Sequence, residues 1–159
     1  MSLLDKEAVK RAEKFLKNFD QSLEVIILEN SARTAQDAAI ALSCDVGAIV
    51  KSLLFKTEDS FILCLVAGDM RCSLNKLKKI KDKKDISMAS PEDVKTQTGY
   101  TIGGVSPIGH LKKIEIIIDN SLKRFNKLFA AAGHPNCVFK IDFNKIQKIT
   151  NGKVEDIIE

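Results

Sequence analysis

Tryptophan is absent from this chain of 159 residues, tyrosine occurs once, and phenylalanine occurs eight times. The core must therefore consist mainly of aliphatic residues, alanine and phenylalanine. No apolar run is long enough to span a bilayer, because the longest lie near residues 48–55 and 61–68. Lys6, Glu7 and Lys10 interrupt the N-terminal segment, so we expect no signal peptide and a cytoplasmic protein.

Several motifs that define common enzyme classes are also missing. The four cysteines include no Cys-x-x-Cys pair, and His110 and His134 are the only histidines. We therefore expect reduced thiols, no metal and no cofactor. The sequence has no Gly-x-Ser-x-Gly elbow, no Walker loop and no dinucleotide fingerprint. These absences argue against a standard serine hydrolase or a nucleotide-binding enzyme.

The overall composition is that of one globular domain, which we expect to span residues 1–159. Apolar residues make up 45% and charged residues 29%, which excludes disorder, collagen and coiled coil. Lysine and arginine outnumber aspartate and glutamate by 25 to 21. The resulting net charge of +4 suits a polyanionic partner without proving one.

Hydrophobic periodicity and capping residues predict helices and strands in irregular alternation. Helices are expected over 5–19, from Thr34, from Ser73, from Ser90 to Gly99 and over 144–150. Strands are expected over 25–28 as a buried strand, 48–56, 60–67, 114–118, 127–132 and 137–141, with a hairpin turn at 57–60 and a polar–apolar tail at the end. We therefore predict an α+β fold, with a mixed, largely antiparallel sheet and flanking helices.

Lys51 is the most informative charged residue. On a strand it shares one face with Ile49, Leu53 and Phe55, which places its ammonium against the core or in an apolar pocket. One interpretation is a lysine that snorkels at a strand edge. The other is a cation held for a phosphate or for the developing negative charge of a carbonyl oxygen.

A glycine-rich segment, residues 99–109, holds four of the eight glycines. Such density indicates positive-φ positions and close backbone approach, and Pro107 stiffens the segment. Either its N–H groups cradle a carbonyl oxygen or a phosphate, or the segment is an irregular turn without a ligand.

Six lysines lie between residues 76 and 84. Leu74, Leu77 and Ile80 define the buried face of the predicted helix, so the lysines occupy the other side. That side is either merely solvated or contacts the backbone of a nucleic acid. The candidates for the backbone contact are Lys76, Lys78, Lys79 and Lys81.

Four motifs follow one another along the chain. They are Ser31-x-Arg33-Thr34-x-x-Asp37-Ala38-Ala39, Ile49-Val50-Lys51-Ser52-Leu53, Ala67-Gly68-Asp69-x-Arg71 and Thr98-Gly99-Tyr100-x-x-Gly103-Gly104-Val105-Ser106-Pro107-x-Gly109. In this order they resemble the YbaK/prolyl-tRNA synthetase editing-domain family, and the resemblance extends over residues 5–150. The strand with Lys51, followed by the Gly-Gly-x-Ser-Pro sequence, is its most specific part.

The resemblance implies a barrel-like sheet of six or seven strands with surrounding helices. It implies a free-standing trans-editing deacylase that hydrolyses the ester of mischarged aminoacyl-tRNA, with proline tRNA carrying alanine, cysteine or another small amino acid as the expected substrate. The lack of an acid near Val138 favours an amino acid other than cysteine. The implied partners are the acceptor end of aminoacyl-tRNA and prolyl-tRNA synthetase, with no membrane and no DNA.

The resemblance also implies the residues of the site. Lys51 carries the catalytic charge, and a free hydroxyl of the terminal tRNA ribose helps to place the attacking water. The implied substrate-binding residues are Gly103, Gly104, Val105, Ser106, Pro107, Gly109, Thr34, Ser52, Gly133 and His134. Two alternatives stay open: a non-catalytic module on the same fold that binds tRNA or a synthetase, and a hydrolase of other small esters.

Overall fold

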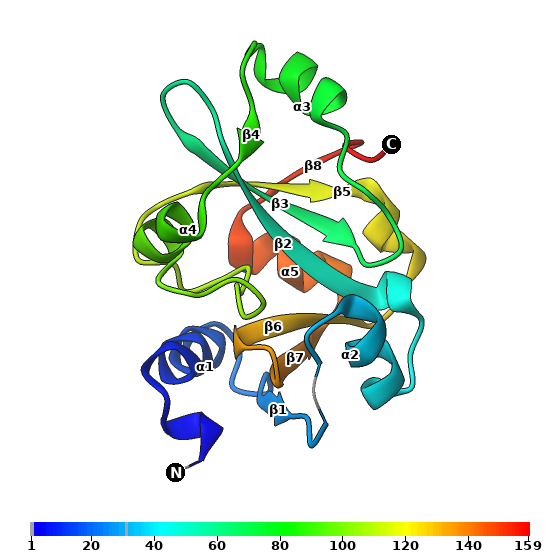
Figure 1. Cartoon of the computed structure of the whole chain (residues 1–159). Helices are drawn as coiled ribbons and strands as arrows, with labels where there is room; N and C mark the ends of the chain where they lie inside the picture. Colours follow the sequence, from blue (N-terminus) through cyan, green and yellow to red (C-terminus); the bar gives the residue numbers. More distant parts are fainter. Residues whose placement is uncertain (1, 31) are drawn as a thin grey trace.

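A mixed sheet of eight strands forms the centre of the protein, which a computed structural model describes at residues 2–30 and 32–159 (Figure 1). The strands are β1 (Val25–Ile27), β2 (Ile49–Lys56), β3 (Phe61–Ala67), β4 (Ser87–Met88), β5 (Glu115–Asp119), β6 (Leu128–His134), β7 (Cys137–Ile141) and β8 (Lys153–Glu155). Their order is β1-β7-β6-β2-β3-β5-β8, with β4 paired to β2. Ser31, the first residue of the quoted motifs, lies outside the described residues.

The pairing of the strands confirms the predicted fold class. The pairs β1/β7, β6/β7, β2/β3 and β2/β4 are antiparallel, whereas β2/β6, β3/β5 and β5/β8 are parallel. The sheet is therefore mixed, and its antiparallel pairs are a narrow majority.

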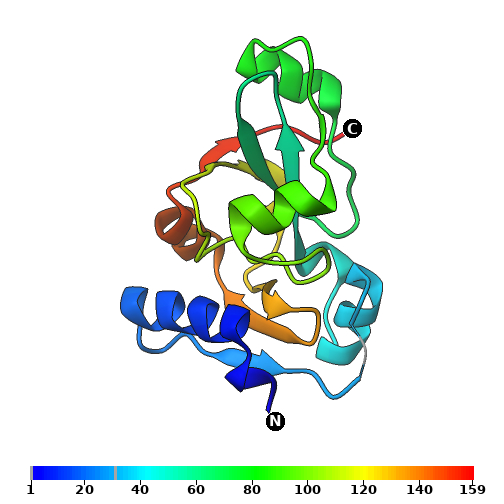
Figure 2. The same ribbon diagram turned by 60° about the vertical axis from the view of Figure 1, so that its left-hand side comes forward.

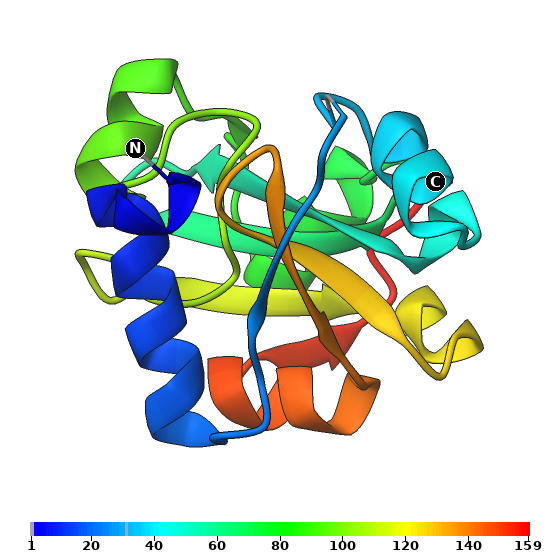
Figure 3. The same cartoon turned by 90° about the horizontal axis from the view of Figure 1, so that it is seen from below.

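Helices cover the sheet on several sides. They are α1 (Glu7–Phe19), α2 (Ala35–Leu42), α3 (Leu74–Lys81), α4 (Pro91–Thr98) and α5 (Phe143–Thr150), with 3-10 turns at Leu3–Asp5, Val46–Ala48 and Asn120–Arg124. Helix α1 packs on β6 and α2 packs on β2, and the two lie on opposite sides of the molecule in Figure 3. Helix α4 lies between α3 and α1 in Figures 1 and 2. None of these helices is long and apolar enough to cross a membrane, within the residues described.

Three of the predicted helix starts are confirmed by side-chain caps, whereas the helix predicted from residue 5 begins at Glu7 without such a cap. The hydroxyls of Thr34, Ser73 and Ser90 each accept a hydrogen bond from the backbone N–H three residues later. Such caps satisfy N–H groups that have no partner within the helix. Gly99 ends α4 with a φ of +81°, a conformation that glycine adopts without strain.

The alternation of side chains along β2 links the parts of the apolar core. Val50 and Leu54 point into the main cluster, which also contains Leu16 of α1 and Ile146 of α5. On the opposite face of the strand, Phe55 packs in a second cluster beneath α3, and Ile49 packs in a third beneath α2. Strand β2 is therefore the element against which the other parts are positioned.

Three details differ from the sequence prediction. The segment at 25–28 is not a buried strand, because β1 pairs with β7 alone among the described strands and leaves Ile27 42% exposed. The C-terminal tail adds β8 to the sheet, parallel to β5. Strand β4 has two residues and no periodic signal, so the sheet has more strands than the six or seven implied by the resemblance.

Candidate functional site

A cavity of about 330 Å³ opens along one edge of β2. On this edge β2 pairs first with β6, through Ile49 and Val50, and later with β4, through Phe55 and Lys56. The stretch between the two pairings, residues 51–54, lines the cavity. The cavity thus lies where the strand changes partners. Its other walls come from α2, the glycine-rich segment, β6 and β7, and include Thr34, Ala38, Gly103, Val105, Ala130 and Val138.

Lys51 stands between this cavity and a second hollow of about 560 Å³. Its side chain is half-buried, and its Nζ donates a hydrogen bond to the carbonyl of Met70. Burial lowers the pKa of the Lys51 ammonium, and the charge of Asp69 partly opposes this shift. Arg71 also borders the second hollow. The ammonium is therefore partly desolvated, and it is anchored on the connection after β3 rather than on the glycine-rich segment.

Ser52 places a buried hydroxyl beside the cavity. Its Oγ is almost inaccessible and makes no hydrogen bond within the part of the chain that the structure describes. A buried hydroxyl without a partner costs about 1–3 kcal/mol. Its neighbours on the same face of the strand, Val50 and Leu54, are apolar and cannot supply a side-chain partner. The hydroxyl thus lies beside the cavity without a partner, covered by its neighbours.

The glycine-rich segment meets the cavity at its tip. Gly103, with a φ of +95°, and Val105 line the cavity. Gly104 lies between them and against β6, where its carbonyl accepts a hydrogen bond of 3.1 Å from the N–H of Gly133. A Cβ on Gly104 would lie 2.9 Å from the backbone nitrogen of His134. Glycine is therefore required at this position for the close approach of the two backbones.

The remaining predicted residues of the segment lie behind its tip. Ser106, Pro107 and Gly109 are buried, but they lie outside the cavity lining. The hydroxyl of Tyr100 crosses the segment and donates to the carbonyl of Ile108 at 2.8 Å. Burial raises the pKa of Tyr100 to about 12, so the hydroxyl remains a donor at neutral pH.

Gly133 and His134 lie at the end of β6, next to the cavity rather than in its lining, which Pro135 supplies at this point. The Nδ1 of His134 accepts a hydrogen bond of 3.0 Å from the N–H of Asn136. Partial burial lowers the pKa of His134, which favours the neutral ring. Gly133 has a φ of +94°, and a Cβ there would lie 2.8 Å from the backbone of Ala8 in α1.

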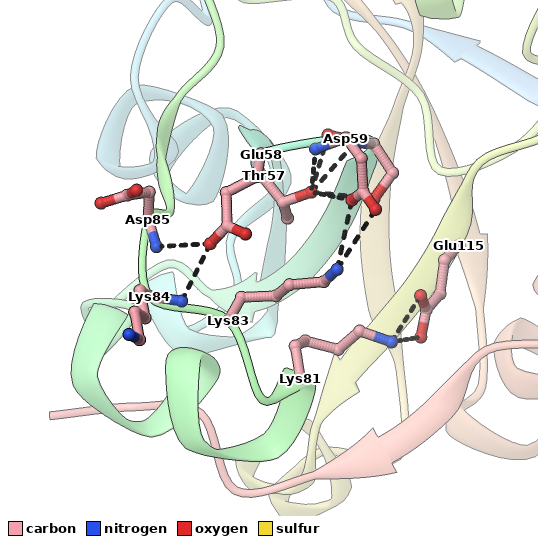
Figure 4. A network of polar contacts seen from close by, with 9 residues as sticks. Thr57, Glu58, Asp59, Lys81, Lys83, Lys84, Asp85 and Glu115 are labelled. Carbon is pink, nitrogen blue, oxygen red and sulfur yellow. Dashed lines mark hydrogen bonds and ion pairs between the residues drawn. The ribbon is translucent and has the colours of Figure 1, made fainter.

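Ion pairs tie the lysine-rich helix α3 and the loop after it to their neighbours, and Figure 4 draws the pairs of Lys81 and Lys83. The pairs are Lys76–Asp156 at 3.1 Å, Lys81–Glu115 at 2.5 Å and Lys83–Asp59 at 3.2 Å. Two of the four lysines predicted to contact tRNA, Lys76 and Lys81, are therefore engaged with acids. Lys78 and Lys79 form no ion pair with any residue that the structure describes.

Two exposed apolar side chains at the cavity were not expected from the sequence. Met88 of β4 is 59% exposed and Ile102 of the glycine-rich segment is 63% exposed, and both line the cavity. The sequence signal is weak, because single exposed apolar residues are common. No group of three histidine, cysteine or acidic side chains gathers at metal-binding distance anywhere in residues 2–30 and 32–159.

Comparison with known proteins identifies relatives of this chain and of its fold. Residues 29–149 match a family model described as "Aminoacyl-tRNA editing domain". The uncharacterized protein YwhH of Bacillus subtilis (strain 168) is 35% identical over 132 residues, which cover 82% of this chain and 83% of YwhH. A proline–tRNA ligase of Thermosipho africanus is 33% identical over 114 residues, which are 72% of this chain but 20% of the ligase. The crystal structure of a suggested trans-editing enzyme for prolyl-tRNA synthetase matches with a TM-score of 0.92 at 34% identity, over 97% of this chain and 98% of that one.

Proposed function

The chain belongs to the aminoacyl-tRNA editing domain family, and we propose on this premise that it hydrolyses the ester bond of mischarged aminoacyl-tRNA. The observation that carries the proposal is the cavity on the edge of β2. It brings together a partly desolvated cation, Lys51, a buried hydroxyl without a partner, Ser52, and the tip of the glycine-rich segment at Gly103 and Val105. Similarity over nearly the whole length of a suggested trans-editing enzyme supports action on tRNA charged by a separate synthetase.

In the proposed reaction, a water oxygen attacks the ester carbonyl carbon, and the bond from that carbon to the ribose oxygen breaks. A proton from the water passes to the ribose oxygen, which gives a free amino acid and a tRNA with both terminal hydroxyls. An aminoacyl ester is already activated, so placing the water and stabilising the oxyanion supply most of the catalysis. We assign the orientation of the water to the neighbouring ribose hydroxyl, so that no protein base is required.

Lys51 is the proposed source of positive charge for this step. A fixed cation in a partly desolvated site stabilises negative charge more strongly than it does in water. The hydrogen bond to Met70 fixes the ammonium without neutralising it, because a carbonyl carries no net charge. An ammonium has three donors, so two remain for the terminal phosphate or for the developing oxyanion.

We propose a small, uncharged amino acid as the group in the cavity. Ala35, Ala38, Ala130 and Val138 form apolar walls there, and Val138 places an apolar side chain where an acid would favour cysteine. An apolar wall of this kind discriminates by size, at about 1–3 kcal/mol per methylene. The similarity to proline–tRNA ligases favours proline tRNA as the carrier, and the small apolar walls favour alanine as the amino acid. The proposed partners are thus the acceptor end of this tRNA and prolyl-tRNA synthetase, in the cytoplasm.

The test is a deacylation panel with alanyl-, cysteinyl-, seryl- and prolyl-tRNA, each with and without prolyl-tRNA synthetase. Alanine methyl ester serves as the small-ester control. We expect hydrolysis of a mischarged tRNA carrying a small amino acid, with prolyl-tRNA spared and the methyl ester turned over poorly.

Two other outcomes would assign another function. Binding of tRNA or synthetase without hydrolysis of any member of the panel would make the protein a non-catalytic module on the same fold. Equal turnover of the methyl ester and of the tRNA esters would make it a hydrolase of small esters, because the tRNA would then contribute no binding energy to catalysis.

A further inference from the structure

Arg11 extends from α1 to the glycine-rich segment. Its Nε donates a hydrogen bond to the carbonyl of Gly109 at 2.8 Å, and its Nη2 donates to the carbonyl of Thr98 at 3.3 Å. Thr98 is the last residue of α4, and Gly109 is the last residue of the segment whose tip lines the cavity. One guanidinium therefore joins the two ends of the segment, which we call its neck.

Further contacts make this neck rigid. The Arg11 guanidinium lies 4.6 Å from the centroid of the Tyr100 ring, in cation–π geometry. The Tyr100 hydroxyl donates to the carbonyl of Ile108 at 2.8 Å and lies 3.3 Å from that of Gly109. The positive charge also faces the C-terminal end of α4, where the helix carbonyls carry partial negative charge. Two of these carbonyls, those of Thr98 and Gln97, also accept backbone hydrogen bonds of 3.2 and 3.1 Å from the N–H groups of Leu111 and Lys112, so Arg11 adds to a backbone connection at the neck.

Helix α1 contacts the opposite wall of the cavity as well. It packs on β6, and Gly133 at the end of β6 approaches Ala8 so closely that a Cβ would lie 2.8 Å away. Gly133 in turn donates the hydrogen bond that holds Gly104 at the tip of the segment. Helix α1 thus braces both the neck of the segment and the strand on which its tip rests (Figures 2 and 3).

We propose that Arg11 is a positioning residue of the deacylase: by closing the neck, it fixes the tip of the glycine-rich segment relative to Lys51 on β2. The effect of Arg11 on catalysis rests on the proposed function, whereas its closure of the neck does not depend on that function. Arg11 lies outside the lining of both hollows, so it acts through the segment rather than on the substrate. Lysine cannot replace it fully, because an ammonium lacks the planar fork that reaches two carbonyls at once.

The test compares Arg11→Ala and Arg11→Lys with wild type, and uses Lys10→Ala as the matched control. Lys10 is the exposed neighbour of Arg11 on the same helix. In Arg11→Ala we expect amide hydrogen exchange over residues 99–109 to accelerate at least about tenfold. We expect kcat to fall about tenfold to a hundredfold, with a smaller change in KM, because a displaced group mainly costs transition-state geometry. Arg11→Lys should be intermediate, and Lys10→Ala should match wild type.

Two readouts separate positioning from a merely structural role. Exchange should accelerate in the glycine-rich segment and not throughout α1 and β6, and added methylguanidinium should restore part of the kcat of Arg11→Ala. A wild-type kcat in Arg11→Ala, measured well below its thermal midpoint, overturns the positioning role. Unchanged exchange over residues 99–109 overturns the closure of the neck. If wild type hydrolyses no member of the panel, the proposed function fails, and the exchange data alone still decide whether Arg11 closes the neck.

Discussion

Replacing Ser52 with alanine should weaken catalysis without weakening the fold. The Ser52 Oγ is buried and has no hydrogen-bond partner among the described residues, so its removal relieves a desolvation cost that the folded state bears. We expect the free energy of unfolding to rise by up to about 1–3 kcal/mol, which is the cost of the unpaired hydroxyl. For a chain of this length, 1 kcal/mol corresponds to about 2–4 °C in the thermal midpoint.

The loss of catalysis follows from the proposed complex. If the substrate satisfies the Ser52 hydroxyl, alanine removes one neutral hydrogen bond, which contributes about 0.5–1.5 kcal/mol. That range corresponds to a decrease of about twofold to tenfold in kcat/KM. The assay is thermal denaturation together with steady-state deacylation of the preferred mischarged tRNA.

Thr57→Val is the matched control for this variant. Thr57 also carries a buried hydroxyl, but its Oγ1 accepts a hydrogen bond of 3.0 Å from the N–H of Ser60, in the turn between β2 and β3. Valine should therefore cost about 1–2 kcal/mol of stability and leave kcat/KM unchanged. A Ser52→Ala protein whose free energy of unfolding falls by more than about 1 kcal/mol, while its kcat/KM equals that of wild type, would show that the hydroxyl stabilises the fold and does not bind the substrate.

Three further predictions concern the charge, the backbone and the basic helix. Burial lowers the pKa of the Lys51 ammonium, which is the proposed active form. The rate of deacylation, after subtraction of spontaneous hydrolysis, should therefore decline as pH rises through a value below 10.5, the usual pKa of lysine. Arginine keeps its charge in this range, so a Lys51→Arg enzyme with the same alkaline decline would contradict the assignment. Gly104→Ala should reduce kcat/KM at least about tenfold, since its Cβ would lie 2.9 Å from the backbone of β6, and a wild-type rate would show that the tip position does not matter. The double variant Lys78→Ala/Lys79→Ala should weaken tRNA binding. The slope of log Kd against log [salt] should also decrease by up to about two, because up to two fewer counterions are released. A slope equal to that of wild type would show that the tRNA does not contact this face of α3.

Helix starts could be predicted from the sequence, because they depend on residues that are close together along the chain. Thr34, Ser73 and Ser90 cap the helices as predicted, because a cap depends on residues three positions apart. The partners of β2 could not be predicted in the same way. Its pairing with β4 and β6 depends on residues far away along the chain, and the cavity arises at the gap between these two pairings.

The same limit applies to the residues of the candidate site. The motifs pointed to Lys51, Ser52, Gly103 and Val105, all of which line the cavity. They gave no reason to single out Arg11, because its hydrogen bonds join residues 87 and 98 positions apart. Support of a site by distant elements has no short-range signature in a single sequence.

In the proposed reaction, Lys51 provides the charge for ester hydrolysis. The most direct measurement is single-turnover deacylation by wild type and Lys51→Ala on the preferred mischarged tRNA, with the thermal midpoint of each sample. The Lys51 ammonium makes one hydrogen bond within residues 2–30 and 32–159, to the carbonyl of Met70, so we expect the midpoint to fall by no more than about 5 °C. We expect the rate to fall at least about tenfold to a hundredfold. A folded Lys51→Ala protein that hydrolyses the ester at the wild-type rate would show that Lys51 does not supply this charge.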